Sequence, residues 1–193
     1  MHIEPLFSCP ILCHDCNHDL DFLTEKCYLA KKYDEGRELS NKGGWQSNEI
    51  YEHDDWFPDL KYDLKLLATE FAKTMGFDIN TNLKLQNMWI NINNYKDYNT
   101  SHTHPNVFLS GVFYVKVPSE DGKIVFRHPA LASMDRDWAN IPVASQNRTN
   151  CRSYYFLPVE NRVFMFPSWL EHEVTPHFLH EDRISISFNF SVV

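Results

Sequence analysis

The sequence predicts a mostly β protein, a jelly roll packed by helices from the N-terminal part of the chain. Aromatic residues make up 15% of the 193 residues, which suits strands better than a helical bundle. Helical periodicity is confined to the first part of the chain, and from Leu83 onward apolar residues recur at every second position. Helices followed by a run of short strands favour a jelly roll or sandwich with the helices outside.

Two helices and an opening strand are expected before residue 83. Asp19 to Tyr33 is predicted to be a helix, and Leu6 to Leu12 a first strand with small buried thiols. Asp59 to Met75 is the stronger helix, because apolar residues recur at intervals of four and three. Pro58 suits its first turn, and Gly76 suits its end. The apolar stripe is formed by Leu60, Leu64, Leu67, Phe71 and Met75.

The rest of the chain predicts strands that alternate apolar and polar residues. They are expected near Leu83 to Asn93, Val107 to Val117, Lys123 to Phe126, Tyr154 to Leu157, Arg162 to Phe166 and Arg183 to Phe190. Asp135 to Cys151 shows no period and is predicted to be a long loop of the kind that often forms a lid. We expect one domain over 1–193, with a strand and support helices in 1–82 and the jelly-roll core in 83–193.

Composition and charge exclude several classes of protein. The formal net charge of -8 argues against a nucleic-acid binder, which needs a basic surface. The sequence has no run of 18 apolar residues, so no transmembrane helix is predicted. Met1 to Pro10 lacks the pattern of a secretory signal. A cytoplasmic protein with reduced thiols is therefore expected. Cys9, Cys13, Cys16 and His18 suggest a zinc site, but no second Cys/His pair lies at finger distance.

Three histidines are candidate metal ligands. His102 and His104 are two residues apart, so on an extended segment both imidazoles point to the same side and can reach one ion. Such a pair alone is often only a polar surface feature. His172 follows the very apolar stretch Phe164 to Pro167, where packing does not require a histidine. The three together predict a metal site.

Arg183 is a candidate anion-binding residue. It begins the last predicted strand, on the face that also carries Ser185, and opposite to Ile184. A guanidinium that points into an apolar sandwich needs an anion, and its planar fork matches a carboxylate. A salt bridge to Glu171, Glu181 or Asp182 is the alternative explanation.

These motifs carry a resemblance to a known family. Residues 91–190 resemble the Fe(II)/2-oxoglutarate-dependent oxygenases on the prolyl-hydroxylase side of that superfamily, closest to a small group found in bacterial and phage genomes. The stretches that carry the resemblance are His102 to Asn106, Leu109 to Val115, Phe166 to Val174 and Arg183 to Phe190, with Leu6 to Ile11 similar to the opening strand of that group.

The resemblance implies a role for each of these residues and a double-stranded β-helix fold. His102 and His172 match metal ligands, and Arg183 matches the residue that pairs with the far carboxylate of 2-oxoglutarate. Ser185 and Tyr114 match hydroxyl groups that hydrogen-bond the same carboxylate.

One position departs from the superfamily. An Asp or Glu usually stands two residues after the first histidine, where this chain has His104. Either three imidazoles hold the iron, which we favour, or His104 lies beside the site and water completes it. Asp97 and Glu173 are further carboxylates, but neither has the usual offset.

The implied reaction is hydroxylation of an unactivated C–H bond with Fe(II), 2-oxoglutarate and O2, releasing succinate and CO2. The substrate could be a peptidyl proline, an amino acid or another small molecule. The oligomeric state is left open, and a homodimer is one of the options.

Two other functions stay open: a cupin-type metalloenzyme that uses no 2-oxoglutarate, and a non-catalytic module stabilised by a metal. An aromatic wall around the substrate could be formed by Trp89, Phe113, Tyr114, Phe166 and Trp169, although ordinary core packing is expected for most of them.

Overall fold

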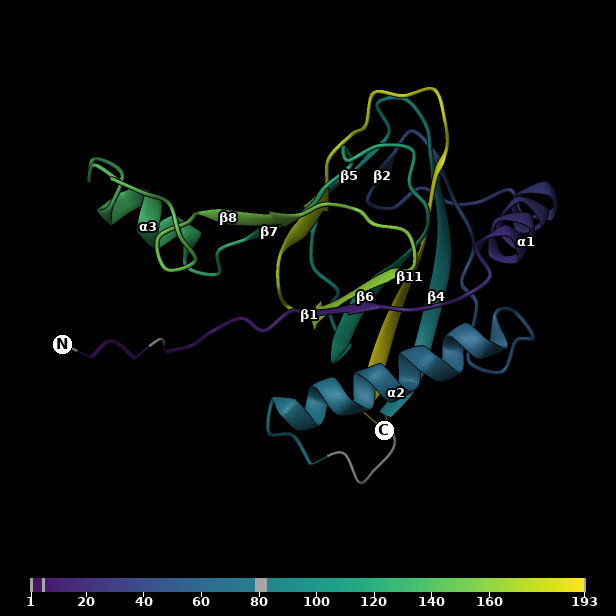
Figure 1. Cartoon of the computed structure of the whole chain (residues 1–193), viewed down its shortest axis with the longest axis horizontal. Coiled ribbons are helices and arrows are strands. Elements are labelled where there is room, and N and C mark those ends of the chain that lie inside the picture. Colours follow the sequence, from purple (N-terminus) through teal and green to yellow (C-terminus); the bar gives the residue numbers. More distant parts are fainter. Residues whose placement is uncertain (1, 5, 79–82, 193) are drawn as a thin grey trace.

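Two antiparallel sheets face each other in the computed structural model, which describes residues 2–4, 6–78 and 83–192 (Figure 1). One sheet has six strands, in the order β1 (Leu12–Asp15), β9 (Arg162–Pro167), β6 (Leu109–Lys116), β11 (Arg183–Val192), β4 (Leu83–Asn93) and β3 (Trp45–Gln46). The other has five, in the order β2 (Asn41–Lys42), β5 (Tyr98–His102), β10 (His172–Val174), β7 (Ile124–Arg127) and β8 (Ser153–Phe156). The mostly β jelly-roll prediction is confirmed, with two open sheets in place of a closed barrel.

Two helices cover the outer face of the six-stranded sheet (Figure 1). Helix α1 (Leu20–Tyr33) begins at Asp19, whose carboxylate accepts the backbone N–H of Phe22 at 3.0 Å. Helix α2 (Pro58–Thr74) has its proline in the first turn, where the missing N–H costs nothing. Both helices match their predicted ranges to within one residue at each end. The apolar face of β11 packs against them, with Ile184, Ile186, Phe188 and Phe190 each 0% exposed.

The packing of α2 on this sheet carries a stability prediction. Leu64 is 0% exposed, whereas Leu66 on the same helix is 50% exposed. Leu64→Ala should lower the free energy of unfolding by about 2–5 kcal/mol, because it leaves a cavity in a packed core. Leu66→Ala should change that free energy by less than about 0.5 kcal/mol. Urea unfolding of both variants measures the difference, and equal losses would show that α2 does not pack as described.

The opposite face of β11 looks into the space between the two sheets. It carries Arg183, Ser185 and Asn189, all of them buried. A second, smaller core fills part of that space, formed by Val112, Tyr114, Ile124, Phe126, Phe164, Phe166 and Leu170. The final strand is therefore buried on both sides, and its polar side faces an interior that a second sheet closes off from solvent.

The opening strand was predicted too early in the chain. Only Leu12 of the predicted Leu6 to Leu12 segment lies in β1, because pairing with β9 begins at Leu12 opposite Met165. Phe7 is 97% exposed, and the thiols expected to be buried are not, since Cys13 is exposed and Cys9 and Cys16 are half-buried. Residues 9–11 are half-buried, and the described residues ahead of them, 2–4 and 6–8, extend away from the sandwich (Figure 1).

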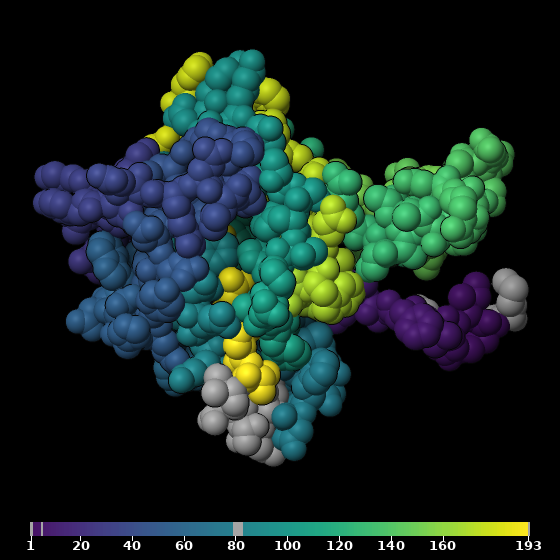
Figure 2. All heavy atoms as spheres, turned by 180° about the vertical axis from the view of Figure 1, so that it is seen from behind, coloured from purple at the N-terminus to yellow at the C-terminus, as the bar shows by residue number. Residues whose placement is uncertain are grey.

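The predicted long loop begins in the last turn of a short helix and projects from the body. Helix α3 (Leu131–Asp137) and the residues that follow it form an arm between β7 and β8, and the arm points away from the sandwich (Figures 1 and 2). From Leu131 to Thr149, all of them described, only the side chain of Met134 is buried. In this arrangement the arm does not cover the space between the sheets as a lid would.

Two remaining expectations concern the chain as a whole. The single domain over 1–193 stays a prediction, and the division between 1–82 and 83–193 falls at residue 82, outside the described residues. Among the residues described, no helix combines the length and apolar character needed to cross a membrane.

Candidate functional site

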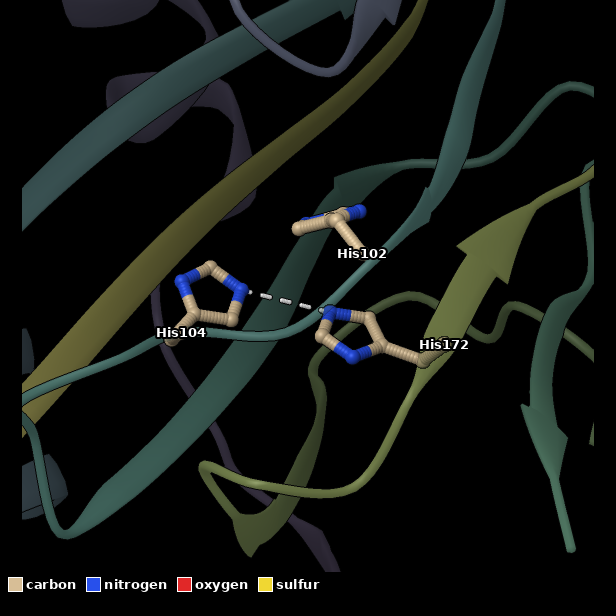
Figure 3. A group of neighbouring side chains, drawn as sticks. All are labelled: His102, His104 and His172. Atoms are coloured by element: carbon tan, nitrogen blue, oxygen red, sulfur yellow. Dashed lines mark hydrogen bonds between the residues drawn. The ribbon is translucent and has the colours of Figure 1, made fainter. Parts of the chain in front are cut away.

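The three predicted histidines meet between the sheets because of strand pairing. Strand β10 pairs with β5 so that His172 lies directly opposite His102, with ring centroids 4.4 Å apart. His104, two residues beyond β5, is held by its backbone N–H, which donates to the Ser168 carbonyl at 3.0 Å. Its Nε2 lies 3.3 Å from Nε2 of His172 (Figure 3). One ligand atom from each ring lies within 4.8 Å of the others, close enough for a single metal ion.

Backbone carbonyls fix the protonation of two of these rings. Nδ1 of His102 lies 2.7 Å from the Thr100 carbonyl, and Nδ1 of His172 lies 2.9 Å from the Leu170 carbonyl. A carbonyl only accepts, so Nδ1 of each ring carries the proton and donates it. Nε2 is then left with a free lone pair, which is the form in which histidine binds a metal.

Burial keeps all three rings neutral. Desolvation lowers the pKa of His172 to about 3, with a further decrease from the neighbouring His102. Desolvation likewise lowers the pKa of His104 to about 4 and lowers that of His102. At neutral pH no proton has to be displaced before the lone pairs can bind a cation. Three neutral imidazoles suit a first-row divalent metal such as Fe(II).

Arg183, Ser185 and Tyr114 gather on the six-stranded sheet. Ser185 on β11 pairs directly with Tyr114 on β6, and Arg183 lies two residues before Ser185 on the same face. Arg183 is 2% exposed, and Tyr114 is 1% exposed. Neither Nε of Arg183 nor the Tyr114 hydroxyl has a hydrogen-bond partner among the described residues.

No acid in the described part of the chain forms an ion pair with the Arg183 guanidinium. Among the described residues it forms no ion pair, and its one hydrogen bond runs from Nη1 to the carbonyl oxygen of Gly122 at 3.0 Å. Glu171, one of the acids considered as a partner, pairs with Arg127. Asp182, another, accepts from the Tyr28 hydroxyl at 2.9 Å. The Gly122 contact was not identified from the sequence, because it is made by a backbone carbonyl, which every residue carries.

The protonation of these two groups suits anion binding. Burial lowers the pKa of Arg183, while the neighbouring Tyr114 and Asp97 act to raise it. Arginine titrates so far above neutral pH that the side chain stays charged. Burial raises the pKa of Tyr114 to about 12, although Arg183 acts to lower it. The phenol therefore keeps its proton and can donate it.

A cavity between the sheets connects the two groups of residues. Its lining, among the described residues, contains no Asp or Glu, and Arg183 is its one permanent charge. Of the five aromatic residues considered for a wall, Trp89, Tyr114 and Phe166 line the cavity. Phe113 instead belongs to the core under the helices, and Trp169 is 56% exposed. Trp89 stacks on His104 with ring centroids 5.7 Å apart.

The other candidate ligands do not join this site. Glu173 pairs with Arg127 at 3.0 Å, and Asp97 accepts the Asn94 backbone N–H at 2.7 Å. Within the described part of the chain, the three histidines are the one group of His, Cys, Asp or Glu side chains placed to hold a metal. The N-terminal cysteines with His18 do not form a second such group. In and beside the arm, Arg136 pairs with Asp137, and Arg152 pairs with Asp135.

Comparison with known families decides between the functions that the sequence left open. Residues 87–189, more than half of the chain, match the family described as "Putative 2OG-Fe(II) oxygenase". The chain belongs to this family. The oxygenase thus requires Fe(II), 2-oxoglutarate and O2, and acts on a small-molecule or peptide substrate. A cupin-type enzyme without 2-oxoglutarate and a non-catalytic metal module do not fit this membership.

Solved structures show the same fold at low sequence identity. A prolyl-4-hydroxylase from Pseudomonas putida superposes with a TM-score of 0.64 at 13% identity, covering 94% of the oxygenase and 91% of that chain. The viral collagen prolyl hydroxylase from Paramecium Bursaria Chlorella virus-1, solved as a 2OG complex, gives 0.62 at 12%, covering 95% and 96%. HygX from Streptomyces hygroscopicus, solved with nickel and 2-oxoglutarate, gives 0.64 at 12%, covering 94% and 82%. No curated protein matches the sequence.

Proposed function

We propose that the oxygenase holds Fe(II) with His102, His104 and His172, and binds the far carboxylate of 2-oxoglutarate with Arg183. Ser185 and Tyr114 donate hydrogen bonds to the same carboxylate. When bound, Fe(II), 2-oxoglutarate and O2 together supply an oxidant that can break an unactivated C–H bond, with release of succinate and CO2. The outcome is hydroxylation of a peptide or small molecule, for which peptidyl proline and a free amino acid are both candidates.

The observation that carries this proposal is the unpaired guanidinium. A buried charge without a counterion is costly, so Arg183 indicates an anion that completes the site. The cavity joins it to three neutral imidazoles and contains no acidic side chain among its described lining residues. With Fe(II) in place the cavity would hold three positive charges, and a dicarboxylate would neutralise two of them. A ligand with an anionic group at each end therefore suits both halves of the site.

The surrounding backbone carbonyls and aromatic side chains would orient the metal ligands and exclude water. The carbonyls of Thr100 and Leu170 hold two imidazoles with Nε2 toward the site. Phe166 and Phe126 flank His172, with ring centroids 4.6 and 6.0 Å from its own. Such a shielded site strengthens electrostatic contacts and limits side reactions with water.

Anaerobic reconstitution tests the proposal directly. Adding Fe(II) and 2-oxoglutarate should produce the visible charge-transfer band of an iron-bound 2-oxo acid, and admitting O2 should yield succinate even without added substrate. Protein with 2-oxoglutarate but no iron is the control for the band. A protein that binds iron but never develops the band, at any 2-oxoglutarate concentration, would contradict the proposal.

Tyr114 carries a prediction of its own. Tyr114→Phe removes a buried hydroxyl that has no hydrogen-bond partner among the residues described, so the free energy of unfolding should stay the same or increase. The same change should raise the Kd for 2-oxoglutarate about tenfold or more, because it removes a hydrogen bond to a charged group. Titration of the visible band together with urea unfolding measures both effects. Tighter or unchanged binding would exclude Tyr114 from the carboxylate site.

A further inference from the structure

Gly122, in the turn between β6 and β7, contacts the guanidinium of Arg183. Its carbonyl oxygen accepts the Nη1 hydrogen bond at 3.0 Å, the one hydrogen bond of that side chain within the described residues. The residue has φ +76°, in the left-handed region where glycine carries no steric penalty. The turn therefore presents backbone, and no side chain, to the buried cation.

Space around the turn is as restrictive as its backbone angle. A Cβ built on Gly122 would overlap Nη1 of Arg183 and would lie 3.1 Å from Cζ. The guanidinium has little room to retreat, because Arg183 is buried and β11 is held by strands on both sides. Any side chain at position 122 would thus displace the charged group itself.

The contact also selects which edge of the guanidinium stays free. With Nη1 held by the Gly122 carbonyl, Nε stays buried and, like the Tyr114 hydroxyl, has no hydrogen-bond partner among the described residues. A carboxylate can take two parallel hydrogen bonds from the edge formed by Nε and Nη2. The turn would orient that edge for an incoming ligand and reduce the rotational freedom lost on binding.

We propose that Gly122 is a positioning residue for 2-oxoglutarate. Its carbonyl fixes the plane of the Arg183 guanidinium. Because Gly122 has no side chain, the guanidinium has room at the far end of the cavity. This inference rests on the proposed role of Arg183 as the carboxylate anchor. It adds that the turn between β6 and β7 sets the position and orientation of that anchor.

A matched pair of glycine substitutions separates this role from ordinary turn formation. Gly76, after α2, is also left-handed at φ +84°, but a Cβ there would meet no atom of a described residue within 4 Å. Gly122→Ala and Gly76→Ala therefore introduce similar backbone strain, and only the first displaces the guanidinium. Binding of Fe(II) alone, of 2-oxoglutarate and of 2-oxopentanoate, which lacks the far carboxylate, is measured anaerobically for each variant.

Gly122→Ala should raise the Kd for 2-oxoglutarate about tenfold or more, the loss expected when a charge-assisted hydrogen bond is misaligned. Its Kd values for Fe(II) and 2-oxopentanoate should match those of the wild type, and Gly76→Ala should leave all three unchanged. If Gly122→Ala does not fold, Gly122→Asn carries the same Cβ with a residue that tolerates this φ, and the same outcome is expected.

The outcomes distinguish the inference from the function on which it rests. If Gly122→Ala binds 2-oxoglutarate with the wild-type Kd while Arg183→Ala loses binding, the role of Gly122 is overturned. Arg183 then remains assigned as the carboxylate anchor. Equal weakening of 2-oxopentanoate and 2-oxoglutarate by Gly122→Ala would also overturn it, because the damage would not concern the far carboxylate. Wild-type binding by Arg183→Ala would remove the anchor itself.

Discussion

Replacing His172 with alanine is expected to abolish Fe(II) binding by the oxygenase, with the Kd for Fe(II) raised about 100-fold or more. His172 is 5% exposed, its Nδ1 is committed to the Leu170 carbonyl, and its Nε2 faces the other two imidazoles. No other described side chain is placed to supply the missing ligand. Equilibrium titration with Fe(II) under anaerobic conditions measures the loss, and the 2-oxoglutarate band should disappear with it.

His177 provides the matched control for this variant. It is also a buried histidine, 0% exposed, but it contacts the Asn93 carbonyl and lies outside the metal-binding group. His177→Ala leaves a comparable cavity, so it should lower stability without changing the Kd for Fe(II). If both variants lost iron equally, the effect would come from damage to the fold and not from a missing ligand.

Replacing Arg183 with alanine is expected to give the largest change in cosubstrate affinity. Breaking a buried ion pair by removing one partner costs about 3–5 kcal/mol, which corresponds to a rise of about 100- to 1000-fold or more in the Kd for 2-oxoglutarate. Iron binding should be preserved, because the one hydrogen bond of the guanidinium among the described residues runs to Gly122 and not to a histidine. Titration of the visible band with 2-oxoglutarate at saturating Fe(II) measures the change.

Two further arginine variants test why Arg183→Ala raises the Kd for 2-oxoglutarate. Arg183→Lys keeps the charge but loses the planar fork, so its affinity should fall between those of wild type and Arg183→Ala. Arg127→Ala removes a half-exposed arginine that pairs with Glu173 outside the cavity lining, and should leave the Kd unchanged. An Arg183→Ala protein with wild-type affinity for 2-oxoglutarate would refute the assignment of the anchor.

The strands and helices with strong periodicity could be predicted from the sequence. The alternation from Ile184 to Phe190 identified a strand with one apolar and one polar face, and the structure buries both. The apolar stripe of α2 likewise identified its packed side. Burial of one face of a helix or strand places apolar residues at a regular interval along the chain, so the local sequence is enough to predict it.

Other features depend on contacts between distant segments and could not be predicted. His102 and His172 are brought together by the register between β5 and β10, and β10 has only three residues. The segment from Leu6 was apolar enough to suggest a strand, but it has no partner strand before Leu12. The contact between Gly122 and Arg183 is made by a backbone carbonyl, which every residue has. The sequence therefore shows only the glycine, and the contact is seen only in the folded structure.

The most direct test of the proposed site is an anaerobic crystal structure with Fe(II) and 2-oxoglutarate, in which anomalous scattering locates the iron. The account predicts one iron about 2.1 Å from a nitrogen of each of His102, His104 and His172. It also predicts the far carboxylate of 2-oxoglutarate hydrogen-bonded to Arg183. Iron bound through only two imidazoles would contradict the ligand role of His104, and a cosubstrate that does not reach Arg183 would contradict the carboxylate anchor.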